Sequence, residues 1–256
     1  MIEKIRQIGL ISKGIIYSFI GLFTFLSALE IGGKISGKNE VFNFFEKQTF
    51  GRFILIAMAI GLLFYAIWRI YAAFYDSRNK GDDKKGVAKR FGYFINGLIY
   101  GALGVSIFLK NITQNNSSNS SDTKQDIASK LMDETYGIVV LYIVAAILII
   151  VGIFQFIKGY RKKFLKSIEV SGRKKELIGK LGFWGFIARG ISFLIFGYFV
   201  AFATYKENAN AIKGIKEMFG FLQDFTWGNI LMGIMALGFS AYGIYQFFLA
   251  LYNSAD

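Results

Sequence analysis

One glycine pattern occurs three times in apolar stretches of this chain, and it constrains the fold more than any other feature. Within each copy, the members follow one another at steps of five, three and four residues. The copies are Gly9, Gly14, Tyr17 and Gly21; Gly92, Gly97, Tyr100 and Gly104; and Gly185, Gly190, Phe193 and Gly197. The sequence therefore repeats itself at the scale of a helix.

A second apolar stretch follows each copy and also repeats. Its glycine always stands 18 residues before a polar residue that directly follows an aromatic one. The copies are Gly51, Trp68 and Arg69; Gly137, Phe154 and Gln155; and Gly228, Tyr245 and Gln246. We therefore predict a single domain, 1–256, made of three tandem two-helix repeats with bounds 1–77, 86–162 and 178–252.

The apolar stretches have the length of membrane spans. Each has about 20 residues, enough to cross a hydrocarbon core of about 30 Å. The chain is 54% hydrophobic with a mean hydropathy of +0.43, whereas the helices of a soluble bundle need a polar face. We predict an all-α polytopic membrane protein with spans near 9–29, 53–74, 91–109, 138–157, 183–204 and 230–251. The three repeats should adopt a pseudo-threefold arrangement.

The segments between the two helices of each repeat carry apolar residues ahead of the second glycine. In the third repeat these follow a helical spacing, with Ile215, Met218 and Leu222 on one side and Lys216 and Glu217 on the other. Such a pattern is typical of an amphipathic helix at a membrane surface. We expect a short outer-surface helix of this kind in every repeat.

Charge predicts the orientation. Eighteen of the 30 Lys and Arg residues fall on the side that holds the N-terminus and the loops 75–90 and 158–181. The positive-inside rule then places both termini and these loops in the cytoplasm. Basic loops beside spans attract anionic lipid headgroups. We expect no nucleic-acid partner, because the loops lack interleaved aromatic residues and any nucleic-acid module.

The residue inventory argues against catalysis. The chain has no His and no Cys, and no Asp or Glu lies within a predicted span. It therefore lacks the usual general base, thiolate chemistry and an oxygen-rich metal site in the membrane. We expect no enzyme activity, no metal and no cofactor.

The repeated residues resemble a known family. The first-helix glycine motif, Phe-Gly-Arg-Phe-Ile-Leu at 50–55 and Gly-Leu-Leu-Phe-Tyr-Ala-Ile-Trp-Arg at 61–69 are similar to the bacterial six-helix membrane proteins of domain of unknown function 1206. The resemblance implies three two-helix repeats in the bacterial inner membrane and supplies no activity. The middle repeat departs from the pattern, with Asn96 in place of a basic residue and Ile147 where the others have Gly61 and Gly238.

A helical wheel places each motif on one face. Gly9, Gly14, Tyr17 and Gly21 fall within one arc at 100° per residue. Small residues on one face let a neighbouring membrane helix approach closely. We interpret the repeated glycines as helix-packing positions: Gly9, Gly14, Gly21, Gly92, Gly97, Gly104, Gly185, Gly190, Gly197, Gly51, Gly137 and Gly228.

Polar and aromatic residues share these faces. In the predicted topology Lys13, Asn96 and Arg189 lie at the same depth as Arg69, Gln155 and Gln246. One interpretation is structural, with cations reaching headgroups and amides bonding nearby carbonyls. The other is a cationic recess, rimmed by Tyr17, Tyr100, Tyr65, Trp68 and Tyr245, that holds an anionic headgroup or amphiphile.

Two functions follow from these features. The first is a non-catalytic module that binds anionic lipid, or a membrane or cytoplasmic protein partner, through its basic side. The alternative is a channel or transporter for a small anion or amphiphile, since a cationic mouth favours anions.

Overall fold

The computed structural model describes residues 2–31, 38–48, 50–75, 81, 83–113, 128–162, 164–165, 168 and 170–252. Six long helices dominate the described chain: α1 (Ile2–Ala28), α3 (Gly51–Phe74), α4 (Lys84–Thr113), α6 (Thr135–Arg161), α7 (Gly172–Tyr205) and α9 (Gly228–Tyr252). Short elements are α2 (Lys38–Glu46), the 3-10 turn η2 (Ala209–Ala211) and α8 (Ile215–Gln223).

All six long helices are long and apolar enough to cross a membrane. The predicted all-α class and the six spans are therefore confirmed, and the protein is a multi-pass membrane protein. The helices extend beyond some predicted spans: α7 begins at Gly172 and α4 at Lys84, both inside the stretches assigned to basic loops.

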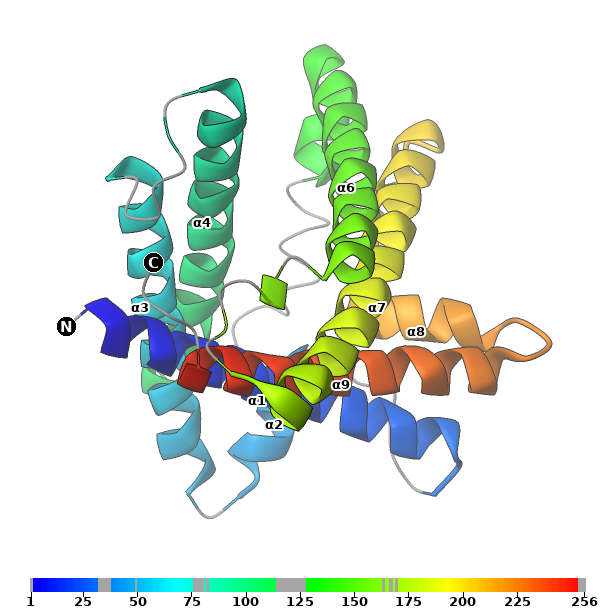
Figure 1. Cartoon of the computed structure of the whole chain (residues 1–256). Coiled ribbons are helices and arrows are strands. Elements are labelled where there is room, and N and C mark those ends of the chain that lie inside the picture. Colours follow the sequence, from blue (N-terminus) through cyan, green and yellow to red (C-terminus); the bar gives the residue numbers. More distant parts are fainter. Residues whose placement is uncertain are drawn as a thin grey trace.

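The strongest packing joins different repeats. Helix α1 packs on α9, α3 on α4, and α6 on α7. Within repeats one and three, α1 also packs on α3 and α7 on α9. Figure 1 shows the α3–α4 and α6–α7 pairs on either side of α1 and α9, which lie across the middle of the molecule.

The three interfaces between repeats are equivalent position by position. In each, the middle glycine of the first-helix motif lies against a side chain at one shared position of the neighbouring second helix. A Cβ on that glycine would come within 3 Å of the side chain, which would then have to shift, so glycine allows the close approach. The pairs are Gly14 with Phe247, Gly97 with Ile70, and Gly190 with Phe156, at 2.8, 2.7 and 2.8 Å.

The last motif glycine repeats this symmetry. A Cβ at Gly104 would lie 3.1 Å from the Ala59 carbonyl oxygen, and one at Gly197 would lie 3.1 Å from that of Ala145. Gly21 faces the Ala236 carbonyl in the same way. Each first helix therefore crosses the second helix of a neighbouring repeat through backbone contact, as the predicted pseudo-threefold arrangement requires.

The helices α2 and α8 each bury one face against the bundle. In α2 the buried residues are Val41, Phe42 and Phe45, and in α8 they are Met218, Phe219 and Leu222. In the second repeat a helical stretch occupies 128–132, while Ile127 lies outside the described residues. The amphipathic pattern thus packs on protein at its apolar face.

A tight turn joins the short helical segment of each repeat to the second long helix of that repeat. The Cβ of any residue replacing Gly51 would collide with the Phe45 carbonyl oxygen. Gly137 stands in the same relation to Leu131, and Gly228 to Gln223. These glycines are therefore required by the turn into the second helix, whereas the first-helix glycines are required by contact between helices.

The second repeat breaks the symmetry. Its helices α4 and α6 share no packed interface in the part of the chain that the structure describes. Of each of these spans 22% is buried, against 44–56% for the other four. The six helices therefore form an open series in the order α4, α3, α1, α9, α7, α6, with α4 and α6 at its ends.

A cluster of cations and tyrosines as the candidate functional site

Lys13 of α1 lies at the meeting point of three helices. Its Nζ is 5.3 Å from the ring centroid of Tyr65, 4.7 Å from that of Tyr100 and 5.6 Å from that of Tyr242. These rings belong to α3, α4 and α9, and Lys13 itself is 4% exposed. A lysine cation is thus surrounded by aromatic rings contributed by all three repeats, at distances that allow cation–π attraction.

Arg189 of α7 contacts one of these tyrosines, Tyr242, and also Tyr17. Its guanidinium carbon is 4.4 Å from the Tyr242 ring centroid and 5.7 Å from that of Tyr17, and its Nη1 donates a hydrogen bond to the Tyr242 hydroxyl. Arg189 is 9% exposed. The Tyr242 ring therefore has two cations within 6 Å, Lys13 and Arg189.

Arg69 of α3 joins the group through Tyr65. Its Nε donates a 2.9 Å hydrogen bond to the Tyr65 hydroxyl, and its guanidinium lies over the Tyr65 and Trp68 rings. A further ring, that of Tyr93 on α4, lies 4.8 Å from the guanidinium carbon. Since Tyr65 also lies beneath Lys13, the three cations are connected through two tyrosines.

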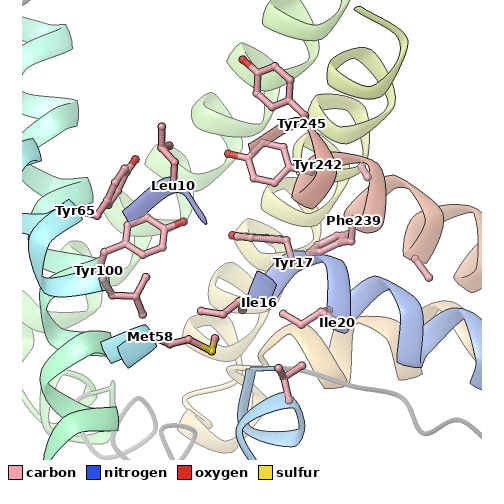
Figure 2. Packing of buried hydrophobic residues seen from close by; sticks show 14 of the residues in the cluster. Leu10, Ile16, Tyr17, Ile20, Met58, Tyr65, Tyr100, Phe239, Tyr242 and Tyr245 are labelled. Carbon is pink, nitrogen blue, oxygen red and sulfur yellow. The ribbon is translucent and has the colours of Figure 1, made fainter. Parts of the chain in front are cut away.

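We call this group the cation–tyrosine cluster. It consists of Lys13, Arg69, Arg189, Tyr17, Tyr65, Tyr100 and Tyr242. Figure 2 shows Tyr17, Tyr100 and Tyr242 directing their hydroxyl groups toward one space between the helices. Edge-on ring contacts connect the members, at 5.1 Å between Tyr65 and Tyr100 and 5.0 Å between Tyr17 and Tyr242.

No carboxylate of the described chain neutralises the two arginines of the cluster. Their contacts are with aromatic rings and tyrosine hydroxyls, and no Asp or Glu is among the buried polar residues that the structure describes. The sequence explains this, because none of the six predicted spans contains an acidic residue. The cluster carries formal positive charge in an apolar bundle.

The other predicted recess residues are not members of this cluster, although Tyr245 contacts it through Tyr242, with 6.1 Å between the ring centroids, and Trp68 contacts it through Arg69. Asn96 donates a 2.8 Å hydrogen bond to the Gly92 carbonyl one turn earlier in its own helix. Gln246 is buried and Gln155 half-buried, and each has a buried Oε1 with no hydrogen-bond partner. Tyr245 packs edge-on against Phe164, 5.2 Å away.

Two cluster partners were not predicted. Tyr242 occupies the position in α9 that Tyr65 occupies in α3, so alignment of the repeats would have identified it. Tyr93 stands outside the repeated motif, and only the packing of α4 on α3 brings it to Arg69.

The basic segment after α6, which was predicted as a cytoplasmic loop, buries two of its apolar residues. Phe164 and Ile168 are buried, and Phe164 contacts Phe186 as well as Tyr245. Apolar residues at 164, 165, 168 and 170, interspersed among lysines, were the available signal. Arg6, a basic residue near the N-terminus, is buried too.

Among the packing glycines, Gly92 stands apart. A Cβ at Gly9 would lie 2.9 Å from the Tyr65 Cα, and one at Gly185 would lie 2.7 Å from the Tyr242 Cα. A Cβ at Gly92 would meet no described heavy atom within 4 Å. The predicted packing role of Gly92 is therefore not realised within the chain, because α6 does not lie against α4.

The fold and its repeats define a class, a multi-pass membrane protein of three two-helix units. The family described as Domain of Unknown Function (DUF1206) matches residues 8–76, 91–162 and 184–253, so the chain belongs to this family. An uncharacterized protein of Bacillus subtilis (strain 168), YxxB, is 24% identical over 255 residues, covering 98% of this chain and 91% of that relative. No solved structure matches.

Proposed function

We propose that this protein is a non-catalytic module of the bacterial cytoplasmic membrane, with cytoplasmic termini, that binds an anionic lipid at the cation–tyrosine cluster. The single observation that supports the proposal is the burial of Lys13 and Arg189 around one ring, with no acidic residue in any predicted span. The ligand class is a phosphate ester or carboxylate attached to an acyl chain.

Energetics favour an anion at this place. Moving a cation from water into a buried site costs several kcal/mol, while a cation–π contact contributes about 0.5–2 kcal/mol. Lys13 and Arg189, two cations beside the Tyr242 ring, also repel each other. A lipid phosphate between Lys13 and Arg189 would offset both costs and would accept hydrogen bonds from the tyrosine hydroxyls.

The alternative remains an anion channel or transporter using the same cations. The aromatic rings argue against a continuous path, because Tyr17, Tyr65, Tyr100 and Tyr242 surround the cations. Their ring centroids are 5.0 Å apart for Tyr17 and Tyr242 and 5.1 Å apart for Tyr65 and Tyr100. A bound lipid is compatible with this arrangement, since its headgroup would lie among the rings without passing through them.

The test removes the three cations and compares a variant with the same loss of charge elsewhere. Lys13→Gln, Arg69→Gln and Arg189→Gln are combined, and the control combines Arg161→Gln, Arg173→Gln and Lys175→Gln, all exposed residues. Phospholipid that copurifies in detergent is quantified by mass spectrometry. The cluster variant should retain anionic lipid about tenfold less well, which corresponds to a net loss of about 1.4 kcal/mol of binding free energy.

The outcomes separate the two functions. Unchanged anionic lipid in the cluster variant, or equal loss in the control, contradicts lipid binding at this site. Anion flux through liposomes that contain the wild-type protein and stops in the cluster variant would favour the channel instead.

A further inference from the structure

In repeats one and three the two long helices pack together, but in repeat two the equivalent faces of α4 and α6 are exposed. We call these two facing surfaces the α4–α6 seam. Phe154 on α6 is 65% exposed, whereas its equivalents Trp68 and Tyr245 are 6% and 3% exposed. On α4, Ile99 is 54% exposed, while its equivalents in α1 and α7 are buried. The same positions that form the core of repeats one and three thus face outward in repeat two.

The sequence of the second repeat accounts for this opening. In repeat one, Gly61 lies directly against Ser12, and in repeat three, Gly238 lies directly against Ala188. Both crossings are between glycine and a small residue. At the equivalent positions the second repeat has Ile147 and Ile95. Two isoleucines cannot approach as a glycine and a small residue do, so α4 and α6 cannot form the same interface.

The cation–tyrosine cluster lies beside this seam. Tyr100, on α4, carries the ring closest to Lys13. The second helices of repeats one and three supply Tyr65 and Tyr242, but the equivalent residue of α6 is Val151. The ring of aromatic residues around the cations therefore lacks a member on the α6 side. One turn beyond Val151, Gln155 has a buried Oε1 without a hydrogen-bond partner.

From these observations we propose that the α4–α6 seam is the lateral entrance by which an anionic phospholipid reaches the cluster. This inference rests on the proposed function. The acyl chains lie along the exposed faces of α4 and α6, and the phosphate reaches Lys13 and Arg189. The unpartnered amide oxygens of Gln155 and of the buried Gln246 suit a headgroup with hydroxyl donors.

Charge complementarity selects the lipid over a second copy of this chain. A second copy would bring no acidic residue within its predicted spans to this seam. It would add cations to a site already positive. An anionic phospholipid supplies both the charge for the cluster and the apolar surface for the isoleucines of the seam.

The experiment closes the seam without changing the cluster. The protein is placed in lipid nanodiscs that contain phosphatidylglycerol with a photoactivatable acyl chain, or phosphatidylcholine as the neutral probe. The seam-closing variant, Ile95→Ser with Ile147→Gly, restores the small residues of repeat one. The matched control is Val105→Ser with Ile153→Gly, two positions on the same helices whose equivalents are exposed in all three repeats.

We expect photo-cross-links from phosphatidylglycerol on α4 and α6 of the wild-type protein, concentrated near Ile95, Ile99 and Phe154. The seam-closing variant should lose them about tenfold relative to the control, and phosphatidylcholine should label the seam weakly. Cross-link positions in the wild-type protein test the inference even if the seam-closing variant fails to fold.

Two further results would overturn the inference in different ways. Labelling that depends on Lys13, Arg69 and Arg189 but maps to other helices, and persists when the seam is closed, leaves the proposed function intact and removes the entrance. Equal labelling by both lipids, insensitive to the cluster substitutions, removes the proposed function itself. Cross-linking of α4 to a second protein copy would contradict the choice of occupant.

Discussion

The first and second repeats share one motif and bury it differently. In repeat one, Gly9 lies against the backbone of Tyr65, and α1 and α3 form a closed seam. In repeat two, Gly92 meets open space, and α4 and α6 each pack on a neighbouring repeat instead. A glycine motif therefore permits close packing of two helices, whereas the size of the facing residues decides whether the helices pack together.

The largest expected effect comes from filling the glycine positions. Gly9→Leu should destabilise the protein by more than about 3 kcal/mol, because the new side chain must push α3 away from α1. Gly92→Leu should change stability by less than about 0.5 kcal/mol, the usual range for substitutions away from packed features. Denaturation of both variants in mixed detergent micelles measures the difference. Similar losses for the two would mean that α4 and α6 pack together in the membrane.

Truncating the equivalent aromatic residues should give an intermediate effect. Tyr245→Ala leaves a cavity between α9 and Phe164 and should cost on the order of 3 kcal/mol. Phe154→Ala removes an exposed ring and should cost well under 1 kcal/mol. Thermal unfolding in detergent, followed by circular dichroism, reports both. If Phe154→Ala proves as damaging as Tyr245→Ala, the seam between α4 and α6 is closed.

The smallest expected effect compares two polar positions. Tyr242→Phe deprives the Arg189 guanidinium of its hydroxyl partner and should cost about 1.5–3 kcal/mol, the value of a hydrogen bond to a charged group. Asn96→Ala breaks a bond within one helix and should cost about 0.5 kcal/mol. Equilibrium unfolding of the two variants in the same detergent checks the order. A larger loss for Asn96→Ala would show that its amide has a role beyond its own helix.

Much of the fold follows from local sequence. Gly51 and its equivalents mark the turns into the second helices, because a carbonyl oxygen occupies the space of any Cβ there. The candidate site was predictable in part: Lys13 and Arg189 share the motif face with Tyr17 and Tyr100. Tyr93 was not predictable, because its contact with Arg69 depends on how α4 packs on α3.

The sequence by itself determined the repeats, the length and apolarity of the spans, and the absence of acidic residues from them, because these properties are local to each segment. The tertiary structure decided which helices pair. Helices α1 and α7 both pack on α9, and these two contacts bring Lys13 and Arg189 to the same Tyr242 ring. Pairing of this kind depends on the fit of two surfaces distant in sequence. No periodicity within one segment specifies that fit.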